Sequence, residues 1–281
     1  LMEGVHFRLH WGAPADLGWK ALAQNLSDIA AMGGTPTHAV IALGLPPHYP
    51  PDDAVALYRG MGELAALAGV DIAGGDTIKS IGPLTLGVTV LGRVDAAAVL
   101  TRAGGRADDA LYVTGALGAA AAGVRLLDSG RPVPEALHDA VRAQLRPQPR
   151  LAAARALAAT GLVTAMMDLS DGVATDLHRL CRASGVGAEV DRAALPIAPV
   201  VPRACRWLAE GGVACDPVAL ALGGGEDFEL LLAAPADADT ALRTAIAPLP
   251  LTRIGRLTAE PALCLREASR LTPLAWGFTH F

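Results

Sequence analysis

Five acidic residues, each beside small residues, are the side chains of this sequence best suited to do chemistry. They are Asp28, Asp76, Asp168, Asp171 and Glu226. Carboxylate oxygens are hard ligands, and Mg²⁺ in proteins is typically held by a few carboxylates together with waters and substrate phosphates. A dispersed acidic set in an acidic protein is best explained by a metal-bridged polyphosphate, so the sequence predicts nucleotide chemistry.

Other common catalytic patterns are not found. Nothing in the sequence resembles a Ser/His/Asp triad, a Cys/His pair or a soft-metal site. The Gly-x-x-x-x-Gly-Lys-Ser/Thr loop and the protein-kinase motif set are missing too. If the protein binds a nucleotide, it does so on neither of the two common scaffolds.

Each acidic motif also has a structural explanation when it is taken alone. Asp28 could be a solvated residue on a helix face, residues 74–77 could form a simple turn, and residues 222–226 could form an irregular polar loop. Helix capping and a favourable helix dipole could explain two of the acids near Asp168. Four polar side chains crowd that turn, however, which is too many for capping alone. They are Asp168, Ser170, Asp171 and Asp176.

The element that must position Asp28 is a helix that ends at Gly33. Four apolar residues recur at spacings of three and four and predict one buried face. They are Trp19, Leu22, Leu26 and Ile29. Asp28 lies in the last turns, where the helix dipole disfavours a carboxylate, so we expect a positive group to face it. Gln24 and Asn25 share its side of the helix.

The elements that follow alternate in type. Residues 39–45 predict a strand, and residues 51–68 predict a helix that opens with proline and aspartate. Residues 70–73 predict a short strand that ends at Gly74, and the alternation over 84–90 predicts a strand with one buried face. This order indicates an α/β domain.

The chain begins with a segment that also has strand character. Residues 2–9 predict a strand in which His6 alternates with Val5 and Phe7. A lone histidine in such a strand is more often structural than functional. Because Leu1 precedes Met2, we expect that the natural N-terminus is missing.

The second half continues the alternation. Its expected elements are a strand at 110–114, a helix to residue 127, a helix over 134–145, a strand edge at 166–168 that turns into a helix, and a strand at 230–233. A polar joint with glycines over residues 101–109 separates the halves. We therefore expect two domains, residues 1–105 and residues 106–281.

Composition excludes several classes of partner. The chain has 281 residues, 52% of them hydrophobic, and a formal net charge of -5, with a pI near 5.8. A negative net charge does not favour binding to nucleic acid or to a membrane surface. No stretch reaches the roughly 18 consecutive apolar residues that a membrane-spanning helix needs. The four scattered cysteines, Cys181, Cys205, Cys215 and Cys264, indicate reduced thiols and a cytoplasmic protein.

Taken together, the motifs closely resemble those of the thiamine-monophosphate kinase family, which belongs to the superfamily of aminoimidazole ribonucleotide synthetase. The matching segments run in order over nearly the whole chain. They include Glu3-Gly-Val-His6-Phe7, Asn25-Leu-Ser-Asp28, Gly74-Gly-Asp76-Thr77, Thr101-Arg102, Asp168-Leu-Ser-Asp171-Gly172 and Gly224-Gly-Glu226-Asp227. One such motif would be weak, but this many at compatible spacings are specific.

The resemblance implies ATP-dependent phosphorylation of thiamine monophosphate to thiamine diphosphate, in thiamine diphosphate biosynthesis. It implies that Mg²⁺ is held by Asp28, Asp76, Asp168 and Asp171. It implies that ATP is bound by Gly75, Asp76, Arg102 and Ser170, and thiamine monophosphate by His6, Glu226 and Phe278. The implied fold has two domains of α/β (α+β) type: an N-terminal domain that forms a homodimer through its sheet, and a C-terminal α/β domain that closes the site.

The residues fit this chemistry without the family name. A phosphate monoester has a second pKa of about 6 and is largely ionised at neutral pH, so the acceptor needs no dedicated general base. It needs its repulsion against ATP neutralised, which several Mg²⁺ ions and Arg102 would do. We therefore expect direct in-line transfer without a catalytic His or Cys.

The family also has a Gly-Asp-Asp segment and a further metal-binding Asp upstream of the point where this chain begins. We therefore expect the chain as written to fold but to be nearly inactive. Two alternatives stay open: another ATP-using member of the superfamily, of the synthetase type, or an inactive nucleotide-binding fragment.

Overall fold

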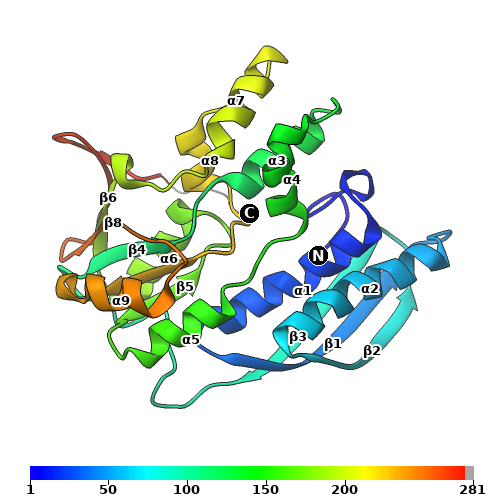
Figure 1. Ribbon diagram of the computed structural model, residues 1–281, viewed down its shortest axis with the longest axis horizontal. Coiled ribbons are helices and arrows are strands. Elements are labelled where there is room, and N and C mark those ends of the chain that lie inside the picture. The colour runs from blue at the N-terminus through cyan, green and yellow to red at the C-terminus, as the bar shows by residue number, and fades with distance from the viewer. Residues whose placement is uncertain (276–281) are drawn as a thin grey trace.

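The computed structural model describes residues 1–275, which form two sheets with helices packed on them (Figure 1). The N-terminal sheet has three strands in the order β2-β1-β3. Strand β1 (Thr35–Leu45) is parallel to β2 (Asp71–Lys79) and antiparallel to β3 (Thr85–Arg93). Helices α1 (Pro14–Ala31) and α2 (Pro51–Ala68) cover one face of this sheet.

Helix α1 confirms the prediction made from its apolar spacing. Trp19, Leu22 and Leu26 are buried, and Ile29 is partly buried against the same core. Proline at the first helical position favours the start of the helix, and Gly33, with φ of 71°, follows its end. Asp28 is therefore held near the carboxyl end of a buried, well-anchored helix.

Two glycines allow α1 and α2 to pack backbone against backbone. A Cβ on Gly18 of α1 would lie 1.9 Å from the carbonyl oxygen of Leu57, and one on Gly60 of α2 would lie 1.8 Å from that of Ala15. No side chain fits at such distances. The contact fixes the position of α1 on the sheet.

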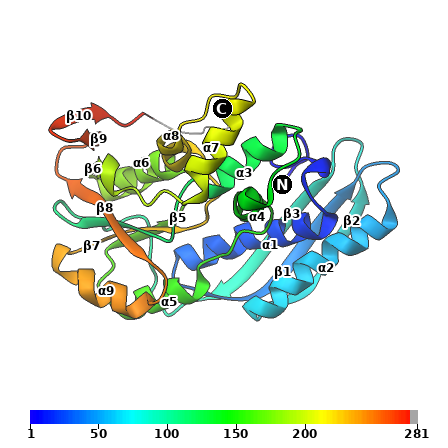
Figure 2. The ribbon, with the colours of Figure 1, turned by 45° about the horizontal axis from the view of Figure 1, so that its top comes forward.

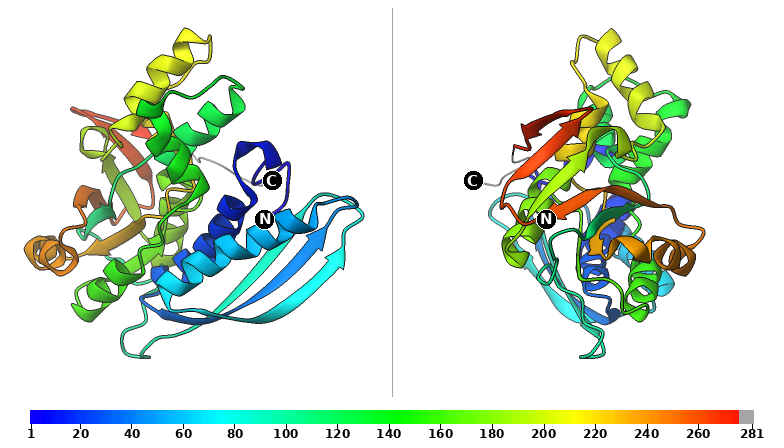
Figure 3. Two further views of the ribbon diagram at one scale, coloured as in Figure 1. Left: turned by 45° about the vertical axis from the view of Figure 1, so that its right-hand side comes forward. Right: turned by 90° about the vertical axis from the view of Figure 1, so that its left-hand side faces the viewer.

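The opposite face of the N-terminal sheet is covered by none of the described residues, as Figure 3 shows. Along β1, Ala39, Ile41 and Leu43 point into the core, while Val40 between them is exposed. Leu91 on β3 is 55% exposed on the same sheet. The sheet thus presents an apolar surface to solvent.

The C-terminal sheet has seven strands in the order β10-β9-β6-β8-β4-β7-β5. Its strands are β4 (Ala110–Thr114), β5 (Ala165–Asp168), β6 (Gly187–Asp191), β7 (Leu230–Ala234), β8 (Leu251–Thr258), β9 (Leu263–Glu267) and β10 (Arg270–Pro273). Its helices are α3 (Ala119–Asp128), α4 (His138–Leu145), α5 (Leu151–Ala159), α6 (Val173–Ser184), α7 (Val200–Glu210), α8 (Pro217–Gly223) and α9 (Asp239–Ile246). Figure 2 shows α5 and α9 on one side of the sheet and α6 on the other.

One apolar core connects the two sheets. Tyr112 of β4 and Leu230 of β7 belong to the same buried cluster as Leu22 and Leu26 of α1. Leu111 of β4 faces the other way, into a second cluster with α6. Because α1 contacts both sheets, the site residues that it carries are brought beside the C-terminal sheet. None of the helices in residues 1–275 has the length and apolar character to cross a membrane.

Three expectations about local structure were wrong. Residues 2–9 form isolated bridges and turns instead of a strand, because Gly4 reverses the chain with φ of 81° and the Nδ1 atom of His6 accepts a hydrogen bond from the Met2 N–H. Strand β2 does not end at Gly74 but continues to Lys79. A Cβ on Gly75 would lie 1.9 Å from the carbonyl oxygen of Ile41, so this glycine permits close strand pairing inside β2.

The third concerns the cysteines. Cys205 on α7 and Cys215 form a disulfide, so the expectation of four reduced thiols does not hold for this pair. Their Cα atoms are 4.9 Å apart, within disulfide range, a proximity that their ten-residue separation does not reveal. Cys181 and Cys264 are free thiols.

Candidate functional site

A cavity of about 390 Å³ lies where α1 meets the loops of the C-terminal sheet. Six residues singled out from the sequence line it, although they come from distant parts of the chain. They are His6, Asp28, Asp168, Ser170, Asp171 and Glu226. Val5, Trp11 and Phe228 add apolar surface. The cavity therefore combines an acidic wall with an apolar one.

Asp28 and Asp168 form the acidic centre of the cavity. Asp168 ends β5, is 7% exposed, and its Oδ2 accepts a hydrogen bond from the Ser27 hydroxyl at 2.6 Å. Burial raises the pKa of Asp168 to about 6, and the negative charge of Asp28 adds to this rise. Burial also raises the pKa of Asp28, while Arg102 lowers it. Arg102 thus supplies positive charge near Asp28, where a positive group was expected.

Asp176, which the sequence placed in the same acidic group, has a structural role. Its side chain is fully buried, accepts a hydrogen bond from the Asp171 N–H at 2.9 Å, and pairs with Arg179 at 2.7 Å. Arg179 also pairs with Asp171 Oδ2 at 2.5 Å. Burial raises the pKa of Asp176 to about 7. Asp176 and Arg179 therefore hold the turn that presents Ser170 and Asp171.

The glycine-rich loop before β7 is tied to that turn. The Glu226 N–H donates to the Ser170 carbonyl at 2.8 Å, and the Phe228 N–H donates to the Leu169 carbonyl at 2.9 Å. Glu226 and Phe228 both have positive φ, 61° and 49°, which is uncommon for residues with side chains. Strained backbone of this kind concentrates at functional sites. Glu226 lines the cavity from this loop.

Lys20 and Gln24 hold Glu226, and the sequence analysis did not identify Lys20 as a site residue. The Nζ atom of Lys20 is 2.8 Å from Glu226 Oε1, and its side chain is only 3% exposed. The Gln24 amide donates to the same carboxylate at 3.4 Å. Lys20, Gln24 and Asp28 are spaced by four residues, which is the signal that places them on one face of α1.

Three of the predicted site residues that the structure describes do not line the cavity, and a fourth falls outside the described residues. Gly75 and Asp76 lie within β2, at the edge of the N-terminal sheet, and do not line the cavity. Phe278 lies outside the described residues. Arg102 does not line the cavity either, although its charge reaches both Asp28 and Asp168.

The donor set of the cavity suits a hard cation that keeps ligands of its own. Within residues 1–275, no three His, Cys, Asp or Glu side chains converge closely enough to hold a metal by themselves. The charge of Asp28 nevertheless disfavours ionisation of the buried Asp168, and a cation bound near the two carboxylates would relieve this. Mg²⁺ fits such a pair because it binds through one or two carboxylates and completes its shell with waters and phosphates.

Two family models match the two halves of the chain. The model described as "AIR synthase related protein, N-terminal domain" covers residues 1–94, and the corresponding C-terminal domain model covers residues 106–266. Together with the cavity between the halves, these matches define a two-domain protein of the AIR synthase related class.

Curated relatives identify the family within this class. The thiamine-monophosphate kinase of Bacillus subtilis is 34% identical over all of this chain and 86% of its own length, and that of Escherichia coli K12 is 37% identical over all of this chain and 84% of its own. The chain belongs to the thiamine-monophosphate kinase family.

Solved structures with the same fold agree with this family assignment. The thiamine monophosphate kinase of Stenotrophomonas maltophilia is 36% identical, with a TM-score of 0.84 over 94% of this chain and 82% of its own. A structure described as AaThiL complexed with AMPPCP and TMP is 28% identical, with a TM-score of 0.86 over 100% of this chain and 85% of its own. The two-domain α/β fold expected from the sequence is confirmed.

Proposed function

We propose that this protein transfers the γ-phosphoryl group of ATP directly to thiamine monophosphate, giving thiamine diphosphate and ADP. The observation that carries the proposal is the cavity with Asp28 and Asp168 on its acidic wall and Glu226, held by Lys20, beside them. Support comes from relatives that are named thiamine-monophosphate kinase and from the related structure with AMPPCP and TMP.

Individual roles are assigned from motif resemblance, supported by position for the residues that line the cavity. We assign Mg²⁺ binding to Asp28, Asp76, Asp168 and Asp171, ATP binding to Gly75, Asp76, Arg102 and Ser170, and thiamine monophosphate binding to His6, Glu226 and Phe278. The assignments at Gly75, Asp76 and Phe278 rest on motif resemblance alone, because the first two lie on β2 and not in the cavity and Phe278 lies outside the described residues.

The residues of the chain supply orientation and charge. When bound, Mg²⁺ neutralises the repulsion between the donor and acceptor phosphates. Ser27 fixes the orientation of Asp168 through its hydrogen bond, and Arg102 adds positive charge near both central acids. Lys20 offsets the charge of Glu226, so that this side chain can accept hydrogen bonds without repelling a phosphorylated substrate. The acceptor phosphate, with its second pKa of about 6, needs no general base.

Further proposals concern the whole protein. We propose that it acts in the cytoplasm as a homodimer joined through the uncovered face of the N-terminal sheet. We also propose that the domains divide at residues 105 and 106, in the polar segment that precedes β4.

The direct test is incubation with ATP, Mg²⁺ and thiamine monophosphate, followed by chromatographic detection of thiamine diphosphate. We expect thiamine diphosphate and ADP in equal amounts, and none from an Asp168→Asn variant that is folded. ADP formed with a different acceptor, and no thiamine diphosphate, would instead favour the synthetase type of superfamily member.

A further inference from the structure

Gln144, in the last turn of α4, carries a buried amide without hydrogen-bond partners. The residue is 1% exposed, and neither Nε2 nor Oε1 has a partner in the described structure. Buried side-chain amides are normally paired, because loss of water is costly unless a hydrogen bond replaces it. An unpaired amide of this kind is available to a ligand or a water.

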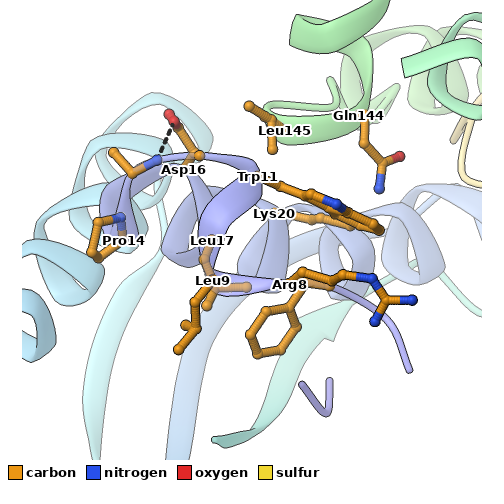
Figure 4. Close-up of a pocket in the computed structure, with 12 residues that line it drawn as sticks. Arg8, Leu9, Trp11, Pro14, Asp16, Leu17, Lys20, Gln144 and Leu145 are labelled. Carbon is orange, nitrogen blue, oxygen red and sulfur yellow. Dashed lines mark hydrogen bonds between the residues drawn. The ribbon is translucent and has the colours of Figure 1, made fainter. Parts of the chain in front are cut away.

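The position of this amide is fixed by helix packing. A Cβ on Gly123 of α3 would lie 2.8 Å from the Cβ of Gln144 and 2.3 Å from the carbonyl oxygen of Ala140. Helix α4 therefore lies against the bare backbone of α3, and the stem of Gln144 is held there. Figure 4 shows its amide directed toward Trp11 and Lys20.

The amide faces a cavity of about 30 Å³, which is room for a group the size of a water or an amino group. Most of its wall is apolar and includes Phe7, Leu17 and Leu145. The charged side chains on the wall are all in ion pairs within the described structure.

These pairs join Lys20 to Glu226, Asp16 to Arg146 and Arg8 to Asp128. Gln144 is thus the polar lining side chain left for a new partner.

This small cavity adjoins the functional site. Trp11 lines both cavities, and its indole Nε1 donates to Asp128 of α3 at 3.2 Å, which restrains the ring. Lys20 lines the small cavity and contacts Glu226 of the larger one. A ring bound beside Trp11 could therefore reach Gln144 with one edge.

We propose that Gln144 is a specificity-determining residue that binds the aminopyrimidine edge of the substrate. This inference rests on the proposed function, whose acceptor ends in such a ring. The amide carbonyl accepts from the exocyclic amino group, and the amide N–H donates to the neighbouring ring nitrogen. Glutamine pairs in this bidentate way with the similar edge of adenine. The water-sized cavity takes the amino group.

The test compares thiamine monophosphate with its analogue in which hydrogen replaces the pyrimidine amino group. We expect wild-type kcat/KM to favour the amino substrate by about 10- to 100-fold, since two hydrogen bonds to a buried amide are at stake. Gln144→Met, which keeps the shape of the side chain, should lose this preference by raising KM for the amino substrate alone. Gln144→Leu serves as a second variant, and Gln148→Met, at an exposed glutamine, is the matched control.

Equal losses with both substrates would assign Gln144 a structural role, and an unchanged preference would mean that its amide binds only water; either result overturns the inference. Calorimetric binding of the two phosphates makes the same comparison without turnover. If wild-type protein forms no thiamine diphosphate, the proposed function fails, while the binding data still decide the role of Gln144.

Discussion

Asp28 and Asp168 line the same cavity, in which the charge of the exposed Asp28 makes ionisation of the buried Asp168 less favourable. A buried carboxylate beside a second negative charge is costly unless it is paired. Arg102 offsets the cost only in part. The two carboxylates therefore favour a positive ligand, such as a hydrated cation that is bound together with a nucleotide.

The burial of Asp168 predicts a pH dependence of stability without Mg²⁺. The pKa of Asp168 is about 6 in the folded protein against an ordinary value of 3.8, so the folded state holds its proton more tightly. The free energy of unfolding should therefore rise as pH falls from 7 toward 4, by about 2 kcal/mol from this group. The gain is lost again as pH rises through 6. Denaturant unfolding in a chelator should show it in wild type but not in Asp168→Asn; a wild-type minus variant difference that stays constant with pH would contradict the burial argument.

Glu226 should contribute to binding of thiamine monophosphate and not of the nucleotide. Lys20 and Gln24 hold Glu226, whereas Arg102 acts on Asp28 and Asp168. We therefore expect Glu226→Gln to raise KM for thiamine monophosphate by about 10-fold or more, with little change in nucleotide affinity. Titrations of AMPPCP and of thiamine monophosphate separate the two effects. Weakened AMPPCP binding with unchanged substrate binding would reverse the assignment.

Residues that line the cavity were predictable where the sequence places an acid beside small residues, as at Asp28, which follows Ser27, and at Asp171, between Ser170 and Gly172. Asp176 was grouped with them because its burial and its bond to Arg179 cannot be read from the chain. Lys20 was missed because a lysine in a helix usually lies in solvent. The one signal that could have identified Lys20 is its spacing of eight residues from Asp28, which places both on the same face of α1.

At the scale of elements, helix α1 is fixed by glycine contacts with α2, which supports the geometry of the site. Gly60→Ala should lower the free energy of unfolding by about 1–3 kcal/mol, because the new Cβ meets the Ala15 backbone. Gly62→Ala, on the same helix with open space around it, should instead raise it by about 0.5–1 kcal/mol. Thermal and denaturant unfolding measure both. Equal effects at the two positions would show that the close contact is not real.

Helices and buried strands were predictable because their apolar spacing matches their period, as in α1, α2 and β4. The start of the chain was not, because Gly4 turns a segment that has strand composition. At Gly74 and Gly75 the sequence predicted the end of a strand, but β2 continues, because the missing side chain of Gly75 permits close strand pairing. A glycine signals close approach, but the sequence does not say of what.

At the scale of the molecule, the uncovered sheet face should join two copies. Val40 and Leu91 are exposed on neighbouring strands, and contiguous exposed apolar surface commonly marks an interface. We expect sedimentation velocity to show a dimer, and Leu91→Glu to yield a folded monomer. Leu67→Glu, at an exposed residue of α2, is the matched control. A wild-type monomer, or dissociation by both variants, would contradict this interface.

The central claim is direct transfer of the phosphoryl group between two phosphates in one cavity, with no residue of the chain carrying it. The most direct measurement uses ATP made chiral at its γ-phosphorus by oxygen isotopes, with thiamine monophosphate as acceptor. A single in-line displacement inverts the configuration at phosphorus. The account predicts inversion in the thiamine diphosphate that forms. Retention would reveal two displacements through a phosphorylated residue and would contradict it.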